Sequence, residues 1–180
     1  TKKNAVLVDA NTHPQTLAVV RTRMEPIGID LHVQSPDTFD AERHFAVVVS
    51  HPASDGLVRD RSALETLVVE IHAAGAIAIA ATDLLALTLL HSPGSLGFDI
   101  AVGSSQRFGI PLGFGGPHAA FMACREEHAR SLPGRLVGVS TDTAGRPTLR
   151  LTLQTREQHI RREKRSEEHT SELQAPMNLV

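Results

Sequence analysis

The stretch FAVVVSHPASDGLVRDRSALETLVVEIHAAGAIAIAA, residues 45–81, carries the strongest fold signal in the chain. Phe45–Val49 is a β-branched run and Ala76–Ala81 is a second short apolar run, and both are typical of buried strands. Between them, residues 60–74 place apolar side chains at helical spacing, and Gly75 follows where helices often end. A strand, a helix and a strand in this order indicate a βαβ unit with parallel strands.

The same alternation extends in both directions from this unit. Before it, Ala5–Val8 and Ile29–Val33 are strand candidates on either side of a helical pattern at Gln15–Met24. After it, Phe98–Val102 and Ala119–Cys124 are further strand candidates. We therefore predict an α/β fold, with a mainly parallel sheet and helices on both of its faces.

Three smaller elements are expected in addition. They are a short helix over Leu84–Leu90 capped by Asp83, a polar helix near Glu126–Leu132, and an antiparallel hairpin of Leu136–Ser140 with Pro147–Leu153. Neither an internal repeat nor a low-complexity linker interrupts residues 1–164, so this range is predicted to be one domain.

Composition excludes several classes of protein. With 180 residues, 41% hydrophobic content and a formal net charge of −2, the chain can bury a single globular core. Its longest apolar runs fall short of the ~20 residues that cross a bilayer, so no membrane association is expected. A nearly neutral charge and only six Phe, with no Tyr or Trp, argue against nucleic-acid binding.

The sequence also offers few candidate residues for metal binding or covalent catalysis. The single cysteine, Cys124, excludes an intramolecular disulfide and is expected to be a buried core thiol in a reducing compartment. The ten histidines form no ligand pattern with cysteines or carboxylates, so we predict no metal site. The only lysines are Lys2, Lys3 and Lys164, which leaves the body of the chain without an amine for Schiff-base chemistry.

Gly103–His118 is the segment most suggestive of a binding site, because it holds five glycines and two prolines between two apolar runs. Such a loop can present its backbone to a ligand or a second chain, or it can be a tight surface connection. It opens no helix and lacks a Gly-Lys-Ser/Thr ending, which disfavours dinucleotide and P-loop sites. Asp83, directly after a strand, either binds a cofactor or caps a helix, and capping is favoured.

Five segments carry a resemblance to a known family. They are Gly103–Phe121, Leu132–Ser140, Leu153–Lys164, His13–Thr16 and Ala81–Leu87. Together they closely resemble the P-protein of the glycine cleavage system, and the likeness covers residues 4–164. This resemblance implies part of the large domain of a pyridoxal-phosphate-dependent enzyme with the aspartate-aminotransferase-like fold, from the first, N-terminal, of two related halves.

The resemblance also implies an activity and its partners. The family decarboxylates glycine and transfers the aminomethyl group to the lipoyl arm of the H-protein, whose disulfide is the oxidant. The implied partners are therefore glycine, the lipoylated H-protein, and the second half of the enzyme in the same chain or in a separate subunit. The implied compartment is the cytoplasm for a bacterial parent and the mitochondrion for a eukaryotic one.

The chain departs from the family pattern at the cofactor. Gln106 corresponds to the position of the cofactor lysine in the second half, and the acid for the pyridine nitrogen falls near Ala80 rather than at Asp83. We therefore expect no catalytic residue in this chain, and a cofactor-supporting loop at Gly115, Gly116 and His118. The alternative is a structural half that contacts a catalytic partner without touching cofactor, and a less favoured one is an unrelated nucleotide-binding domain.

The end of the chain departs from the family as well. Residues 165–180 resemble the translation of a sequencing-library adapter, so we expect this tail to be non-native and the P-protein-like fragment to be residues 1–164.

Overall fold

A computed structural model describes residues 3–113, 119–133 and 136–153. The chain forms two compact units, Thr1–Cys124 and Arg125–Val180. The sequence carries no linker-like composition at the division between them. The expected non-native tail, residues 165–180, lies outside the described residues.

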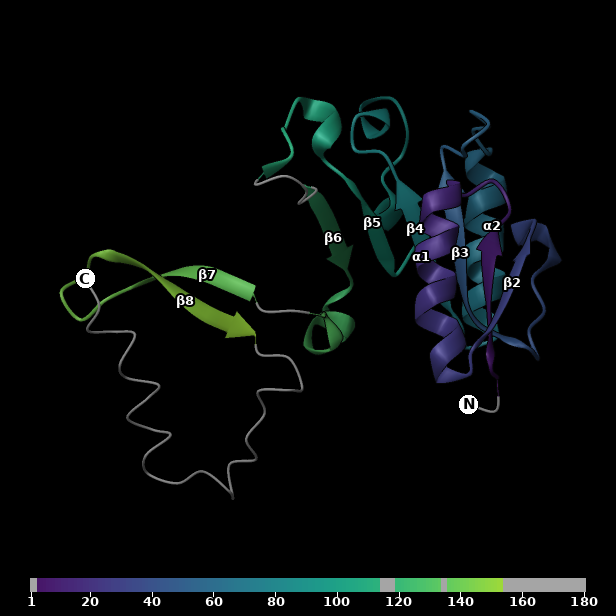
Figure 1. Ribbon diagram of the computed structural model, residues 1–180, viewed down its shortest axis with the longest axis horizontal. Helices are drawn as coiled ribbons and strands as arrows, with labels where there is room; N and C mark the ends of the chain where they lie inside the picture. Colours follow the sequence, from purple (N-terminus) through teal and green to yellow (C-terminus); the bar gives the residue numbers. More distant parts are fainter. Residues whose placement is uncertain (1–2, 114–118, 134–135, 154–180) are drawn as a thin grey trace, which may run out of the picture. The chain divides into compact units, whose positions relative to one another are not determined.

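The first unit is built on a six-stranded sheet with the strand order β2-β1-β3-β4-β5-β6. The strands are β1 (Ala5–Asp9), β2 (Asp30–Gln34), β3 (His44–His51), β4 (Ile77–Thr82), β5 (Ile100–Ser104) and β6 (Ala120–Cys124). All neighbouring pairs from β2 to β5 are parallel, and β6 runs antiparallel to β5 (Figure 1). The mainly parallel sheet expected from the sequence is confirmed.

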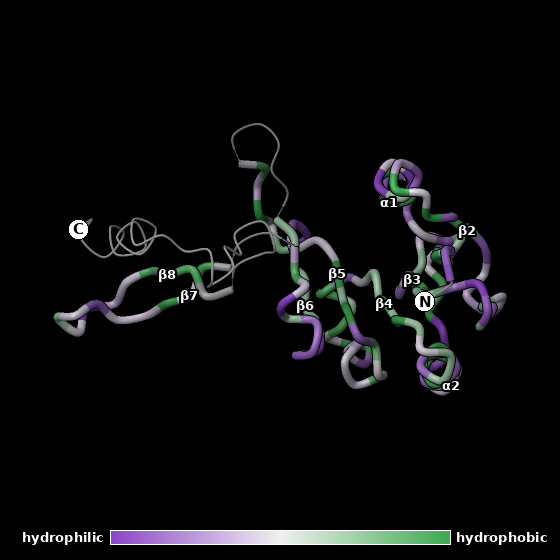
Figure 2. The backbone as a smooth tube through the Cα atoms, turned by 90° about the horizontal axis from the view of Figure 1, so that it is seen from below, coloured by the Kyte–Doolittle hydropathy of each residue, from purple (hydrophilic) through white to green (hydrophobic). Residues whose placement is uncertain are grey.

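Two α-helices cover opposite faces of this sheet, α1 (Pro14–Met24) and α2 (Arg61–Ala73) (Figure 2). Side chains of β1 point alternately to the two faces of the sheet, and each face carries its own apolar cluster. Leu7 packs in the cluster that contains the buried side chains of α2. Val6 and Val8 lie in the other cluster, against which Leu17 of α1 packs. The expectation of helices on both faces is therefore confirmed.

Helix α2 lies within the range expected for it, because its apolar side chains recur on one face. Leu64, Leu67, Val68 and Ile71 are all buried. Gly75 follows the helix with φ of +65°, a left-handed conformation that glycine adopts without a steric penalty.

The expected helix at Leu84–Leu90 does not form; only a 3₁₀ turn, η3 (Ala86–Thr88), is present there. A short helix needs tertiary packing of an apolar face, and the side chain of Leu89 is 91% exposed. The polar helix expected near Glu126–Leu132 is likewise the 3₁₀ helix η7 (Glu126–Ser131). Other 3₁₀ turns among the described residues are η1 (Glu25–Ile27), η2 (Pro36–Thr38), η4 (Pro93–Leu96) and η5 (Gln106–Phe108).

The second unit contains the expected hairpin, formed by β7 (Leu136–Thr141) and β8 (Pro147–Leu153). Its turn is closed by Asp142, whose Oδ1 accepts hydrogen bonds from the backbone N–H groups of Ala144 and Arg146, each at 2.8 Å. Gly145 adopts a φ of +79° in this turn.

Cys124, the last residue of β6, is partly buried rather than buried in the core as expected. In the part of the chain that the structure describes, no helix is long and apolar enough to cross a bilayer.

Candidate functional site at the carboxyl edge of the sheet

The parallel strands β1, β3 and β4 all end at one edge of the sheet, which we call the carboxyl edge. From β1 the chain places β2 on one side and β3, β4 and β5 on the other, so the order of strands reverses between β1 and β3. Open α/β sheets bind ligands at the carboxyl edge beside such a reversal. The topology therefore selects this edge as the place to look for a site.

Buried polar side chains gather at the carboxyl edge. Thr12 Oγ1 and Ser50 Oγ are 3.1 Å apart, and they join the segment after β1 to the end of β3. Thr82 Oγ1 of β4 donates to the backbone carbonyl of His51 at 2.7 Å. The alternation of side chains along the strands puts Asp9, His51 and Thr82 on the face of the sheet that α2 covers. This edge is therefore polar and cross-linked, while the rest of the same face is apolar.

Two atoms of this cluster have no hydrogen-bond partner. They are Asp9 Oδ2 and His51 Nδ1, in side chains that are only 2% and 4% exposed. Buried polar atoms are normally hydrogen-bonded, so this pair is an exception at the position that the topology selects. Burial lowers the pKa of His51, and the nearby positive charge of Arg59 lowers it further, which favours a neutral imidazole.

Asp83 follows β4 at the same edge and has two partners within the chain. Its Oδ1 accepts a hydrogen bond from the backbone N–H of Leu85 at 3.1 Å. Its Oδ2 forms an ion pair with Nη1 of Arg107, a residue of η5. The sequence favoured Asp83 as a helix cap, but no α-helix forms there. Asp83 instead closes the turn that follows β4, and its charge is neutralised by Arg107 of the glycine-rich segment.

The glycine-rich segment leaves β5 through Gly103, where backbone and side chains approach closely. A Cβ on Gly103 would lie 2.1 Å from the carbonyl oxygen of Thr82 and 2.6 Å from the ring of Phe121. The two ends of the segment are joined by Ser105, whose backbone N–H donates to Ala119 O at 2.9 Å, and by Ser104, whose hydroxyl donates to the same oxygen at 3.1 Å. Glycine is required at position 103 because any side chain there would clash with Thr82 and Phe121.

The residues expected to support the cofactor are Gly115, Gly116 and His118, and all three lie outside the described residues. Their role stays a prediction.

The described residues do not fit covalent attachment of pyridoxal phosphate. Among them the sole lysine is Lys3, whose ammonium donates to the carbonyl oxygen of Ala74 just after α2. Lys3 lies two residues before β1, so it is at the edge of the sheet opposite Gln106, which lies two residues after β5. At the position that the family resemblance assigns to the acid, Ala80 is 1% exposed and belongs to the apolar core beneath α2.

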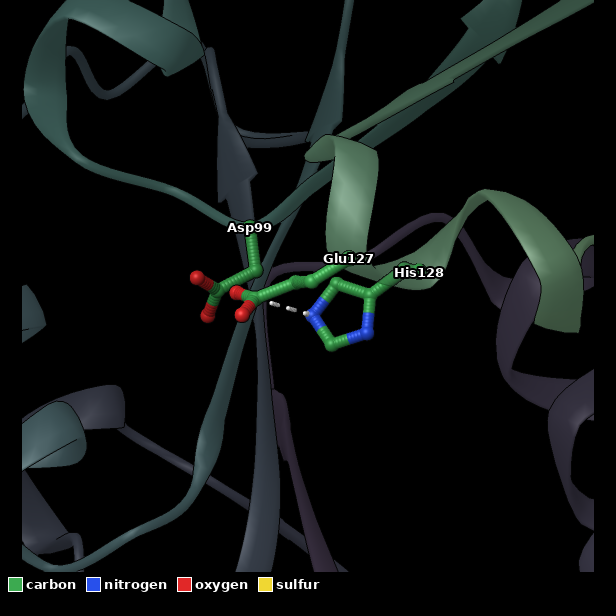
Figure 3. Close-up of side chains that lie close together, drawn as sticks. All are labelled: Asp99, Glu127 and His128. Carbon is green, nitrogen blue, oxygen red and sulfur yellow. Dashed lines mark ion pairs between the residues drawn. The ribbon is translucent and has the colours of Figure 1, made fainter.

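Figure 3 shows three side chains that carry metal-ligating atoms, Asp99, Glu127 and His128. Glu127 and His128 are adjacent residues of η7 in the second unit, with 3.8 Å between Oε1 and Nε2. Asp99 belongs to the first unit, where its Oδ2 accepts from the backbone N–H of Ala78 and contacts Nε2 of His72, each at 2.8 Å. We assign no metal centre to these residues.

A family model described as "Glycine cleavage system P-protein" matches residues 1–178. The chain belongs to the P-protein family. Curated relatives agree: "Glycine dehydrogenase (decarboxylating)" of Gluconobacter oxydans is 58% identical over 164 residues, and that of Nostoc punctiforme is 56% identical over 162. These alignments cover 91% and 89% of this P-protein chain, but only 17% and 16% of the relatives. The chain therefore spans about a sixth of their length.

Solved structures confirm the fold. A crystal structure of glycine decarboxylase (P-protein) of the glycine cleavage system, in inhibitor-bound form, is similar with a TM-score of 0.73 and 38% identity, over 97% of this chain and 41% of that one. Cystathionine gamma synthase from Xanthomonas oryzae pv. oryzae, with a TM-score of 0.53 and 12% identity over 69% and 33% of the two chains, is similar in fold alone.

The sequence predictions missed the buried polar cluster of this P-protein chain. Asp9 follows the apolar run Ala5–Val8, and Ser50 and His51 follow Phe45–Val49. Polar residues directly after two buried strands of a parallel sheet were a usable signal, because those strand ends meet at one edge.

Proposed function

We propose that this chain is a portion of an enzyme that decarboxylates glycine and passes the aminomethyl group to the lipoyl arm of the H-protein, whose disulfide is reduced. Membership of the P-protein family supports the proposal, as do relatives named glycine dehydrogenase (decarboxylating). Bound to the complete enzyme, pyridoxal phosphate supplies the electron sink for loss of CO₂. The partners are then the second half of the enzyme and the lipoylated H-protein, in the cytoplasm if the parent is bacterial like these relatives.

We propose further that this chain supports the cofactor site without attaching the cofactor. The observation that carries this proposal is the position of Lys3, which is hydrogen-bonded to Ala74 O beyond the amino ends of the strands. At the carboxyl edge, Gln106, which lies two residues after β5, carries an amide instead. The role left to this chain is to contribute backbone from Gly115 and Gly116, with His118, while the second half supplies the lysine.

Reductive trapping in the complete parent enzyme tests where the cofactor is attached. Borohydride treatment followed by proteolysis and mass spectrometry is expected to find the cofactor on a peptide outside residues 1–164. Stoichiometric label on a peptide within residues 1–164, where the lysines are Lys2, Lys3 and Lys164, would refute the supporting role.

Glycine substitutions test whether the loop touches the cofactor. Gly116→Val in the parent enzyme is expected to weaken pyridoxal-phosphate binding by about tenfold or more, equivalent to roughly 1.4 kcal/mol, because a side chain would keep the backbone from the ligand. Gly94→Val is the matched control, since a Cβ on Gly94 meets nothing within 4 Å. Cofactor affinity is read by titration of the absorbance of the bound cofactor.

The alternative is a structural half that takes part in assembly without contacting cofactor. The ion pair of Asp83 with Arg107 and the apolar surroundings of Ala80 favour it, because neither site leaves an acid free to face a ligand. Under this alternative, Gly116→Val lowers assembly of the enzyme while cofactor affinity of the assembled fraction is unchanged.

A further inference from the structure

Five large apolar side chains are exposed on the two segments that follow β4 and β5. Leu85 and Leu89 lie after β4, and Leu89 is 91% exposed. Phe108, Ile110 and Leu112 lie in the glycine-rich segment after β5, and Phe108 is 55% exposed. We call these five side chains the apolar edge.

The two segments of the apolar edge are fixed to neighbouring positions. They continue from adjacent parallel strands, in which Ala81 pairs with Val102. The ion pair between Asp83 and Arg107 then joins the start of one segment to η5 in the other. Asp83 also accepts a hydrogen bond from the backbone N–H of Leu85, so its carboxylate connects the two segments of the apolar edge.

Charge on these segments is balanced. Across residues 83–92 and 104–113, Asp83 and Arg107 are the only acidic and basic residues besides His91, and they neutralise each other. Single exposed apolar side chains need no explanation, but five on two joined segments with no net charge are typical of a protein contact surface. A highly charged partner, such as a nucleic acid or an anionic membrane, would find no complementary charge here.

We propose that the apolar edge is a docking surface for protein from the rest of the parent enzyme, which covers it with apolar side chains; this rests on the proposed function. The length of this chain relative to the whole enzyme indicates where that protein comes from. This chain spans 17% of the length of the relative from Gluconobacter oxydans and 41% of the P-protein chain in the crystal structure, so most of the enzyme lies outside it.

Site-directed labelling of the folded parent enzyme tests the proposal. Leu89→Cys and Phe108→Cys are compared with Val19→Cys on α1 and Val69→Cys on α2, whose native side chains are 60% and 66% exposed. We expect a maleimide to label positions 89 and 108 at least about tenfold more slowly than both controls, because a covered side chain reacts only when the interface opens. Equal labelling at all four positions would overturn the proposal. Mass spectrometry of each peptide separates these sites from native cysteines.

A charge substitution supplies the second readout. Phe108→Asp in the parent enzyme is expected to lower the thermal unfolding midpoint, since it places a carboxylate in an apolar contact, while Val19→Asp leaves it unchanged. Equal effects of the two substitutions would count against the docking surface. Protection of positions 89 and 108 in the 180-residue chain alone, rising with its concentration, would reveal a second copy as the occupant and would also overturn it.

These outcomes are independent of the proposed function. Glycine decarboxylation and cofactor binding are measured on the wild-type parent, so their absence refutes the function. The labelling pattern and the unfolding midpoint test the surface whether or not the enzyme is active.

Discussion

At the scale of single residues, Gly103 shows how one position limits what the carboxyl edge can tolerate. Its α-carbon lies so close to Thr82 O that an added Cβ would be 2.1 Å away, and Phe121 closes the other side. A backbone oxygen in a central parallel pair cannot move aside as a flexible side chain can. The constraint at Gly103 is therefore steric, and it is separate from any role of the glycine-rich segment in ligand binding.

Gly103→Ala is expected to destabilise the chain by about 1–3 kcal/mol, because β4 and β5 must separate to admit the methyl group. Gly94→Ala is the matched control, since a Cβ on Gly94 has open space, and it is expected to change stability by less than about 1 kcal/mol. Urea unfolding measures both. The steric account fails if the two variants are equally stable.

His44 is a second residue whose environment has a measurable consequence. It is 2% exposed, its Nδ1 accepts the backbone N–H of Asp40 at 3.0 Å, and its Nε2 lies 2.8 Å from Nδ1 of His32. These contacts require a neutral His44 that donates from Nε2 to His32. Burial lowers the pKa of His44, the neighbouring His32 and Arg43 lower it further, and the carboxylate of Asp40 opposes them.

Stability is accordingly expected to fall as the pH drops below about 6.5, the ordinary histidine pKa. In that range the unfolded chain binds a proton at His44 that the folded chain resists, so the loss continues down to the lowered pKa of the folded state. The free energy of unfolding at pH 7.5 and 5.5 measures this slope. His44→Gln should flatten it in part, because His51 contributes in the same direction. An undiminished slope in His44→Gln would contradict the assignment.

At the scale of secondary-structure elements, the end of β4 and the turn η5 are held together by Asp83 and Arg107. The carboxylate is 24% exposed and the guanidinium is 62% exposed, so water screens the pair. Exposed ion pairs contribute roughly 0.2–1 kcal/mol. The pair therefore determines where the glycine-rich segment lies more than it stabilises the fold.

A double-mutant cycle with Asp83→Asn and Arg107→Gln is expected to give a coupling energy below about 1 kcal/mol, because the pair is solvated. Amide hydrogen exchange over residues 104–113 should nevertheless rise in either single variant, since η5 loses its link to β4. Exchange unchanged in both variants would show that the ends of the segment at Ser104 and Ser105 suffice to hold it. Asn at position 83 keeps an oxygen for the N–H of Leu85, so the turn after β4 is preserved.

At the scale of the whole molecule, the parts of the fold that could be predicted from the sequence are those that local hydrophobic periodicity encodes. The βαβ unit of residues 45–81, the buried face of α2 and the β7–β8 hairpin all follow from patterns within a dozen residues. The helix expected at Leu84–Leu90 failed because its apolar residues found no surface to pack against, as the exposure of Leu89 shows. Family membership could also be read from the sequence, because the motifs are long and specific.

The sequence by itself thus determined the α/β class, the elements of the sheet and the absence of an internal lysine. Only the tertiary structure decided the strand order, the antiparallel direction of β6, the pairing of Asp83 with Arg107, and the gathering of Asp9 and His51 at one edge. The physical reason is separation along the chain: Asp9 and His51 are 42 positions apart, and Asp83 and Arg107 are 24 apart. Such contacts form when distant strands align in a sheet, and no local pattern encodes that alignment.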